Sequence, residues 1–235
     1  MQLAPLNASL LALIAVLAAC AGTRPETSAK PGINESFLDP SLDVDSFIER
    51  FEGESREVYA LRFEIVGALG IEPGDTVADV GAGTGAFLAA LAQSVGPTGT
   101  VYATDISQPF VDRLADRAAA GGYPWVQARL SGERSADLPS GSADLVFLCD
   151  VYHHFEYPRT MMHSIAKALA PGGEVVIVDF ERIPGISTEW TLNHVRAGKD
   201  EVFAEMDSFG YELVEEISRL PLEENWIARF RLRAK

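Results

Sequence analysis

The sequence predicts one α/β domain built on a doubly wound, mostly parallel seven-stranded sheet, with helices on both faces and a C-terminal antiparallel hairpin. Strand-like and helix-like segments alternate from residue 76 onward, without internal repeats. Residues 145–148, Leu-Val-Phe-Leu, are continuously apolar, which is typical of a parallel strand covered on both faces. A hydrophobic content of 47% is ample for a single core.

Two helices are expected before the sheet, at residues 44–51 and 55–69. In the second, apolar side chains recur at helical spacing and should face the core: Val58, Leu61, Ile65, Val66 and Leu69. A turn at Pro73-Gly74-Asp75 should then lead into the first strand, at residues 76–80.

The first half of the sheet follows from turn and capping residues. A helix from Gly85 should stop at Gly96-Pro97, and a strand at residues 100–104 is closed by Asp105. The next helix is expected to be capped by Ser107 and to end at Gly121-Gly122. Strands at residues 125–130 and 143–149 follow.

The second half repeats this alternation. A helix should begin at Pro158 and end at Pro171-Gly172-Gly173, before a strand at residues 174–180. A further helix spans residues 199–209 and is ended by Gly210. Strands at residues 212–219 and 225–233 should form the final hairpin.

The N-terminus resembles an export signal. Residues 10–21 are apolar or small, too short a run to span a bilayer, and Leu17-Ala18-Ala19-Cys20 resembles a bacterial lipoprotein cleavage box. We therefore divide the chain into a leader (1–20), a polar tether (21–35) and a domain (36–235), with a lipid anchor on Cys20 at the bacterial envelope. Because no basic residue precedes Arg24, a mis-assigned start or a frayed apolar tail in a cytoplasmic protein is the alternative.

Charge and cysteine content exclude some functions. The net charge is −15 and the pI is near 4.6, so the surface should repel phosphate backbones and nucleic acid is not expected as a partner. Simple solubility would also explain this charge. Two cysteines give neither a disulfide framework nor a metal-binding spacing, and Cys149 is interpreted as a small core residue.

A glycine-rich turn lies at the centre of the functional prediction. Residues 77–87, Val-Ala-Asp-Val-Gly-Ala-Gly-Thr-Gly-Ala-Phe, read as strand, turn and helix start, where a small polar ligand can approach the backbone. Asp79, Asp105 and Asp150 each come at or near a strand end, where α/β sheets bind ligands. Asp105 lies 20 residues beyond Gly85 (105 − 85), a usual place for an acid that binds ribose, although it could also cap a helix.

The glycine spacing separates two nucleotide-binding families. Gly81-x-Gly83-x-Gly85 is one residue shorter than the dinucleotide pattern and resembles motif I of the class I S-adenosylmethionine (SAM) dependent methyltransferases. The resemblance continues through Asp105, Asp137-Leu138-Pro139, residues 144–150 and Leu169-Ala170-Pro171-Gly172-Gly173, and covers nearly all of the chain after residue 55. It implies the Rossmann-like methyltransferase fold and SAM as cofactor.

The resemblance also implies roles for individual residues. The turn of Gly81, Ala82, Gly83 and Gly85 would receive the methionine part of SAM, with Asp79 near its ammonium group. Asp105 would accept hydrogen bonds from both ribose hydroxyls, and Ile106 would pack on adenine. Relatives place an acidic residue after the third strand, which here falls within residues 131–135. Asp150 and Arg56 complete the predicted SAM pocket.

The segment Asp150-Val151-Tyr152-His153-His154-Phe155 follows the fourth strand and resembles the His-rich segment of small-molecule methyltransferases. We predict a general base here, His154 before His153, with Tyr152 lining the site. A structural histidine bonded to the backbone is the alternative for His154. No metal is expected, because neighbours in sequence should point apart and no partner ligands are evident.

The region at residues 181–199 should carry acceptor specificity, with Trp190, His194 and Arg196 as an acceptor wall; a loop packed over the sheet is the alternative. The predicted function is methyl transfer from SAM to an unidentified small-molecule acceptor. Two other hypotheses stay open: a lipid-anchored SAM-binding protein without catalysis, because SAM is made in the cytoplasm, and a nucleotide-cofactor oxidoreductase, which the glycine spacing disfavours.

Overall fold

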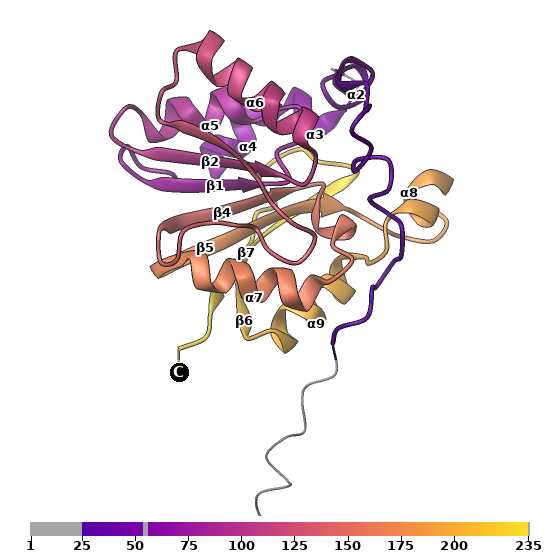
Figure 1. The fold of residues 1–235 in the computed structure, drawn as a ribbon. Coiled ribbons are helices and arrows are strands. Elements are labelled where there is room, and N and C mark those ends of the chain that lie inside the picture. Colours follow the sequence, from indigo (N-terminus) through magenta and orange to yellow (C-terminus); the bar gives the residue numbers. More distant parts are fainter. Residues whose placement is uncertain (1–24, 54–55, 235) are drawn as a thin grey trace, which may run out of the picture.

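A computed structural model describes residues 25–53 and 56–234 (Figure 1). The leader at residues 1–20, with Cys20, and the first residues of the expected tether lie outside this part of the chain. In the described residues, no helix combines the length and the apolar character that crossing a membrane requires.

The core is one seven-stranded sheet with the strand order β3-β2-β1-β4-β5-β7-β6. Strand β7 runs antiparallel to both of its neighbours, and the other neighbouring pairs are parallel, which confirms the predicted fold. The strands are β1 (Thr76–Val80), β2 (Thr100–Asp105), β3 (Val126–Leu130), β4 (Ala143–Cys149), β5 (Leu169–Phe180), β6 (Tyr211–Glu216) and β7 (Asn225–Leu232).

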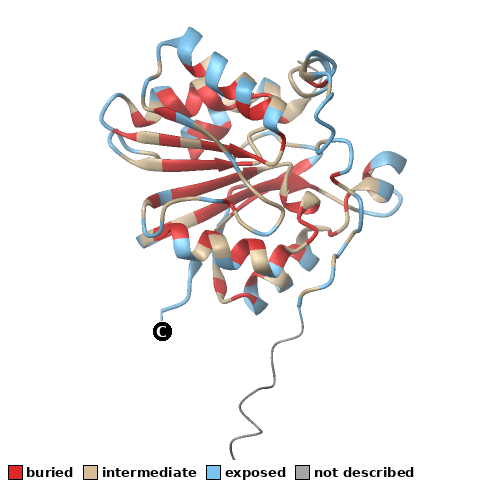
Figure 2. Ribbon diagram, viewed as in Figure 1, coloured by how far each residue is buried: buried red, intermediate tan, exposed pale blue. Residues whose placement is uncertain are grey.

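Helices cover both faces of the sheet, and each face has its own apolar core (Figures 1 and 2). On one face, α4 (Arg62–Ala68), α5 (Leu88–Val95) and α6 (Gln108–Gly121) bury Ile65, Leu91 and Leu114 against the strands. On the other, α7 (Pro158–Ala168) and α9 (Lys199–Ser208) bury Ile165 and Met206. Of the side chains predicted to face the core before the sheet, Val58, Ile65, Val66 and Leu69 are buried and Leu61 is partly buried against the same core.

Some predicted boundaries were wrong. The helix expected at residues 55–69 is two helices, α3 (Glu57–Ala60) and α4, because Leu61 leaves helical geometry at ψ 15°. Helix α7 ends at Ala168, three residues before Pro171, because the buried Leu169 already pairs with Ala143 of β4. Two short elements were not predicted, the 3-10 turn η2 (Tyr152–His154) and α8 (Glu189–His194).

The strand order reverses beside β1, which pairs with β2 on one side and β4 on the other. The carboxyl ends of these strands therefore border the crevice in which open α/β sheets bind ligands. Around this edge lie α2 (Val44–Phe51), η2 and α8, together with the indigo chain that leads into α2 (Figure 1).

The described part of the expected tether is docked on the domain. We call residues 25–43 the N-terminal segment. The Glu26 carboxylate accepts hydrogen bonds from the amides of Arg159 and Thr160, at the start of α7, and Glu156 accepts one from the amide of Gly32. These contacts use helix-start amides that a solvated tether would leave to water. The described part of the expected polar tether thus makes hydrogen bonds to the domain.

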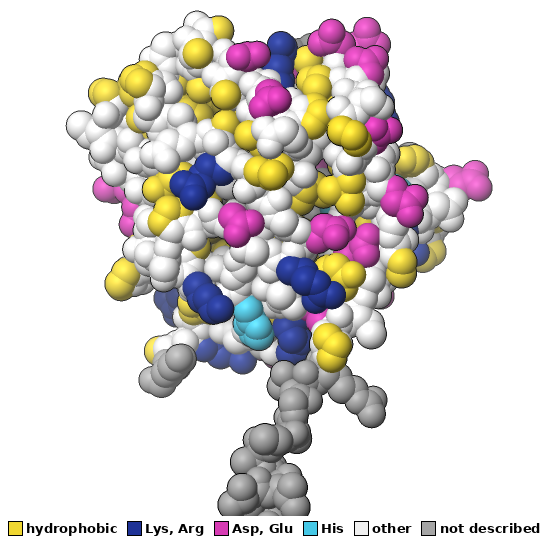
Figure 3. Space-filling model, viewed as in Figure 1, with side chains coloured by type: hydrophobic (Ala, Val, Ile, Leu, Met, Phe, Trp, Pro, Cys, Tyr) yellow, Lys and Arg dark blue, Asp and Glu magenta, His cyan; other side chains and the backbone are white. Residues whose placement is uncertain are grey.

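Charge is unevenly distributed over the face shown in Figure 3. Acidic side chains are scattered over its upper part, whereas Lys and Arg side chains gather lower down, around a histidine (Figure 3). A groove between the β3–β4 connection and α7 is lined by Arg129, Arg134, His163 and Lys167, so the strongly acidic chain carries a local basic region.

Candidate active site

Two adjoining cavities open at the carboxyl ends of β1, β2 and β4. The first cavity is lined by Asp105, Ile106 and Phe110, and the second cavity by Asp79, His153 and His194. The empty space within them, counted together with the solvent at their mouths, is about 660 and 940 Å³. Six residues line both: Phe37, Phe51, Gly81, Gly83, Asp150 and His154. A ligand longer than either cavity could therefore extend from one into the other.

The glycine turn forms one wall of both cavities. Gly81 has a φ of +76°, and its amide and that of Ala82 both donate to the carbonyl of Thr104 in β2. A Cβ at Gly81 would collide with Val151, so only glycine allows the turn to lie this close to the end of β4. Gly85 faces α6, where a Cβ would meet Leu114, rather than the cavities as we expected. The hydroxyl of Thr84 is buried without a partner in the described structure.

Two carboxylates flank this turn. Asp105 accepts hydrogen bonds from the amides of Gly83 (2.9 Å) and Ser107 (2.9 Å), so it joins the turn to the start of α6. Each oxygen has a further lone pair for a ligand hydroxyl. Burial raises the pKa of Asp105 to about 6, and burial followed by repulsion from Asp105 raises the pKa of Asp79 to about 7. Two carboxyl groups so poorly solvated favour a ligand that brings hydroxyl donors and a positive charge.

Asp150 connects the cavities to α3 and β7. Its Oδ2 accepts from Arg56 Nη2 (2.5 Å), and its Oδ1 accepts from Asn225 Nδ2 (2.6 Å). Asp150 has a φ of +52°, a conformation that few non-glycine residues adopt and that is common at functional sites. Arg56, predicted as a residue of the SAM pocket, thus lines the second cavity and forms a partly buried ion pair there.

His153 is held in a fixed orientation from behind. Its Nδ1 lies 2.7 Å from Oδ1 of Asp179 in β5, and its backbone amide donates to Oδ2 of the same carboxylate (3.1 Å). Because a carboxylate only accepts, Nδ1 carries the proton and Nε2 is left with a free lone pair. Both side chains are 2% exposed, so the pair is rigid and dry.

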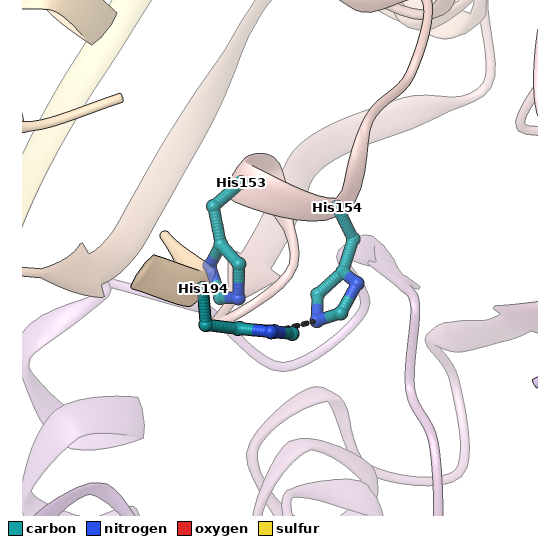
Figure 4. Close-up of side chains that lie close together, drawn as sticks. All are labelled: His153, His154 and His194. Atoms are coloured by element: carbon teal, nitrogen blue, oxygen red, sulfur yellow. Dashed lines mark hydrogen bonds between the residues drawn. The ribbon is translucent and has the colours of Figure 1, made fainter. Parts of the chain in front are cut away.

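His154 and His194 complete a group of three imidazoles, which we call the histidine cluster. Figure 4 shows His153 and His154 extending from one turn of chain toward His194, whose Nε2 lies 3.3 Å from His154 Nε2. The rings of His153 and His154 are 4.4 Å apart between centroids. Our expectation that neighbouring histidines point apart was wrong, because η2 winds these residues so that both rings lie on one side.

His154 and His194 are both neutral at physiological pH. Burial, reinforced by the neighbouring His153, lowers the pKa of His154 to about 2, and the same causes lower that of His194 to about 4. His154 Nδ1 is buried and finds no hydrogen-bond partner among the described residues. The alternative of a structural histidine bonded to the backbone through its ring is therefore not what the structure shows.

Aromatic side chains surround the histidine cluster. Trp190 stacks on His194 with centroids 4.6 Å apart and an interplanar angle of 18°. Phe37 of the N-terminal segment meets His154 edge-on at 5.2 Å, and Asn34 of the same segment donates to the carbonyl of His154. Lys30 donates to the carbonyls of Asn193 and His194 at the end of α8. The N-terminal segment therefore holds η2 and α8 together over the second cavity.

Besides Gly85, two predicted site residues lie away from the cavities. Tyr152 is fully buried on the far side of η2, where its hydroxyl donates to Glu205 of α9 (2.7 Å). Arg196 makes a two-pronged pair with the same carboxylate, at 2.9 and 3.0 Å. As the described residues form them, neither cavity is lined by these side chains. Tyr152 and Arg196 therefore belong to a structural network around Glu205. The chain turns between residues 152 and 153 and again after residue 194, so these two side chains point away from the cavities.

The other predicted residues line the cavities. Asp79, Ala82, Trp190 and His194 line the second cavity, Ile106 lines the first, and Glu133 of the stretch at residues 131–135 lines the first as well. Cys149 lies at the second cavity's edge, where burial raises the pKa of its thiol well above the usual value and keeps it neutral. Asp179 was not predicted from the sequence, although it is an acidic residue near a strand end, like Asp79, Asp105 and Asp150, which were predicted on that basis. Asn34 and Phe37 were not predicted either, because no local signal for them exists.

Known proteins similar to this chain are methyltransferases. Residues 78–175, from β1 into β5, match the family model described as "Methyltransferase domain". The ubiquinone/menaquinone biosynthesis C-methyltransferase UbiE of Ectopseudomonas mendocina is 28% identical over 165 residues, which are 68% of this chain and 62% of that protein. Nocamycin O-methyltransferase of Saccharothrix syringae is 34% identical over 126 residues, 54% of this chain and 45% of that protein.

The fold of this chain is also similar to the folds of solved methyltransferase structures. The crystal structure of a SAM-dependent methyltransferase from Aquifex aeolicus superposes with a TM-score of 0.70, at 22% identity, over 82% of this chain and 98% of that one. The matched part of the chain spans only about three fifths of the length of the curated C-methyltransferases. The comparisons therefore show the fold of a SAM-dependent methyltransferase and a match to a methyltransferase domain over the strands that border both cavities.

Proposed function

We propose that this chain, which carries a methyltransferase domain of the class I SAM-dependent fold, transfers the methyl group of SAM to a small-molecule acceptor. The continuity of the two cavities supports this most directly. The first is bordered by the groups that suit a nucleoside, Asp105 and Ile106, and the second by the histidine cluster, with Gly81, Gly83 and Asp150 common to both. The donor and acceptor would meet where the two cavities join, beside the end of β4.

The residues present fit SAM. The Asp105 carboxylate has free lone pairs for two ribose hydroxyls, and Asp79 in the second cavity would receive the ammonium group, whose charge would offset the cost of ionising this buried acid. Thr84, whose hydroxyl is buried and unpartnered within the described chain, offers a further donor in the turn. When bound, SAM supplies a methyl group on a positively charged sulfur.

The lining of the second cavity suggests the class of acceptor. Aromatic side chains, including Phe37, Phe180 and Trp190, border it, and the histidine cluster provides a polar wall beside the charged groups of Asp79, Asp150, Arg50 and Arg56. Such a lining favours a planar, largely apolar molecule with one ionisable oxygen. The C- and O-methyltransferases among the relatives agree with this chemistry. Holding this molecule in line with the donor and away from water would supply much of the rate.

Loss of a proton from the acceptor would increase its nucleophilicity. In a metal-free site we assign the proton acceptor to His153, because Asp179 fixes its tautomer and leaves Nε2 as the free acceptor. We predicted His154 first from the sequence, but its pKa of about 2 makes it a weak base at neutral pH. If His153→Gln and His154→Gln each retained full turnover, neither imidazole would be the base.

Cofactor binding is the first test of the proposal. We expect SAM, and not NAD, to bind in isothermal titration calorimetry, and Asp105→Ala to weaken SAM binding by about 100-fold, because two charge-assisted hydrogen bonds are lost. Asp112→Ala, which removes an exposed acid on α6, is the matched control and should bind SAM normally. Binding of NAD without SAM would instead favour the oxidoreductase alternative.

Turnover is the second test. Labelled SAM incubated with the protein and a small-molecule extract of the source cell should give a labelled, extractable product, and Asp105→Ala should abolish it. SAM binding with no product from any extract would favour the alternative of a binding protein without catalysis. We also retain export and lipidation at Cys20 as a proposal, supported by the cleavage box alone. An intact mass that starts at Met1 would exclude it.

A further inference from the structure

Three imidazoles from two separate parts of the chain converge on one point in the second cavity. His153 and His154 come from η2 and His194 from the end of α8, forty residues beyond His154 (Figure 4). One ring nitrogen from each lies within 4.8 Å of the other two. The cluster is held from three sides, by Asp179, by Trp190 and by the N-terminal segment.

One of the separations in the cluster is that of two ligands on a metal ion. Two imidazole ligands about 2.05 Å from a tetrahedral ion lie about 3.3 Å apart, and His154 Nε2 and His194 Nε2 are 3.3 Å apart. His153 Nε2 has a free lone pair, because Nδ1 is committed to Asp179. His194 lies at the end of a six-residue helix and is partly exposed, so its ring has room to make the shift, at most about 1.5 Å (4.8 − 3.3), that full coordination needs.

The surroundings of His153 match those of a metal ligand. A ligating histidine usually donates its second ring N–H to a carboxylate, which fixes the ring and increases its basicity. Asp179 takes this position at 2.7 Å, and it is itself held by the backbone amides of His153 and Phe180. A histidine pair that served only to fill the core would not need a buried carboxylate behind it.

The charges near the cluster have both signs. Lys30 and Arg56 bring positive charge and oppose a cation, although Lys30 is bound to carbonyls of α8 and Arg56 to Asp150. Asp179 lies directly behind the cluster, and Asp79 and Asp150 line the same cavity. Arg50 lines this cavity as well, so three carboxylates and three cationic groups lie around the cluster, and the carboxylate nearest to it, Asp179, is in direct contact with His153.

We propose that His153, His154 and His194 together bind one divalent transition-metal ion, with an open coordination position toward the second cavity. Imidazole ligands suit Zn²⁺, Fe²⁺, Ni²⁺ and Cu²⁺, whereas Mg²⁺ and Ca²⁺ prefer oxygen. Three protein ligands with an open fourth position are the pattern of a catalytic rather than a structural zinc site.

The ion would select the acceptor and activate it, and this part of the inference rests on the proposed function. An acceptor oxygen bound to the ion loses its proton to solvent at a lower pH than in water. Because a lone pair that binds metal cannot also take a proton, His153 would then act as a ligand, and the metal would replace it in acceptor activation. The class of acceptor narrows to enols, phenols and similar molecules with an ionisable oxygen.

Metal content is the direct test, on full-length protein that carries no histidine tag. After treatment with a chelator, we expect Zn²⁺ to bind with a stoichiometry of one in calorimetry, and Co²⁺ to give the visible bands of a site with nitrogen ligands. His194→Gln should weaken Zn²⁺ binding by more than the roughly 10–100-fold that the loss of an outer-shell partner costs, and Asp179→Asn by an amount within that range.

His163 provides the matched control. It is the remaining histidine of the sequence, lies exposed on α7 and takes no part in the cluster, so His163→Gln should bind Zn²⁺ as the unaltered protein does. Absence of stoichiometric binding, or equal binding by the His194→Gln and His163→Gln variants, would overturn the proposal. Unaltered circular dichroism and urea unfolding of His194→Gln would show that lost binding is not lost folding.

The metal site and the proposed function can fail separately. SAM affinity is measured on chelated protein and Zn²⁺ affinity without SAM, so each result stands alone. SAM binding without Zn²⁺ binding would leave the methyltransferase proposal with His153 as base and end the metal proposal. Zn²⁺ binding without SAM binding would establish the metal site and overturn the proposed function.

Discussion

The two cavities are built in different ways. The glycine turn and Asp105 come from neighbouring stretches of chain, and the hydrogen bond from Gly83 to Asp105 spans only 22 residues. The histidine cluster that borders the second cavity is assembled from pieces distant in sequence, and Lys30 lies 164 residues from the His194 carbonyl that it contacts. The cofactor side thus depends on local chain geometry, whereas the acceptor side depends on how distant segments pack.

This difference shows where the site should tolerate change. A turn that requires positive φ and close approach to a strand end leaves no freedom at Gly81. The part of the second cavity around the histidine cluster is assembled from a 3-10 turn, a six-residue helix and the N-terminal segment, none of which is part of the sheet. We therefore expect substitutions to have their largest effects on the cofactor side and progressively smaller effects toward the rim of the second cavity.

The largest expected effect is at Gly81. In the Gly81→Ala variant, the new Cβ would collide with Val151 and the turn would have to move away from the end of β4. We expect SAM binding to weaken by at least about 100-fold and the free energy of unfolding to fall by about 2–4 kcal/mol, because overpacking and a left-handed backbone both disfavour alanine here. Calorimetry and urea unfolding measure the two changes.

Gly122→Ala separates the collision from the backbone strain. Gly122 has a similar φ, +68°, at the end of α6, but a Cβ there would meet nothing within 4 Å. It should cost only the strain, about 1–2 kcal/mol, and leave SAM binding unchanged. If both variants bound SAM equally well, the close contact with β4 would not be what shapes the cofactor side.

Most of the residues predicted from the sequence to bind the cofactor line the two cavities, for a physical reason. Asp79, Gly81 and Asp105 can be located from spacing because strand, turn and helix are consecutive, so their positions in the chain fix their positions in space. The same reasoning failed for Tyr152 and Arg196, which are adjacent in sequence to cluster residues or nearly so. In η2, neighbouring side chains point in different directions, so His153 faces the cavity whereas Tyr152, one residue before it, faces α9.

The sequence could not predict that the three residues of the histidine cluster lie close together. His153 and His194 are 41 positions apart (194 − 153), and only the packing of α8 beside η2 brings them together. The contribution of the N-terminal segment was equally hidden, because its polar composition is also that of a flexible linker. Its hydrogen bonds to α7 and α8 become evident only once those helix ends are placed.

A smaller effect is expected from the pH dependence of the cofactor side. The pKa of Asp79 is raised to about 7, so between about pH 4 and pH 7 the folded protein holds a proton that the unfolded chain has lost. The free energy of unfolding without ligand should therefore fall as the pH rises through this window. In Asp79→Asn this slope should be shallower, as urea unfolding at a series of pH values would show.

SAM should reverse this penalty, because its ammonium group would pair with ionised Asp79. We expect SAM affinity to rise by up to about 10-fold per pH unit between about pH 5.5 and pH 7 in the unaltered protein, and much less in Asp79→Asn. Asp112→Asn, at an exposed position of α6, is the control and should follow the unaltered protein. A SAM affinity that does not vary with pH would show that Asp79 is not the ammonium partner.

The network behind the cavity should affect stability and not function. Tyr152→Phe removes one buried hydrogen bond, to Glu205, and leaves the ring in place. We expect the free energy of unfolding to fall by about 1–2 kcal/mol, with SAM affinity and turnover unchanged. A loss of turnover at unchanged stability would mean that Tyr152 takes part in the site, as the sequence suggested.

The smallest effect is expected at the rim, and it separates the two interpretations of the region at residues 181–199. Trp190 is half exposed and stacks on His194, whereas Ile186 in the same region is 79% exposed and lies outside the second cavity. Trp190→Ala should change the free energy of unfolding by less than about 1 kcal/mol and raise the KM for the acceptor about 3–10-fold, the value of one lost aromatic contact, at nearly constant kcat. Ile186→Ala should change neither constant. If the two variants behaved alike, the region would be a loop packed over the sheet, and acceptor recognition would rest on the histidine cluster alone.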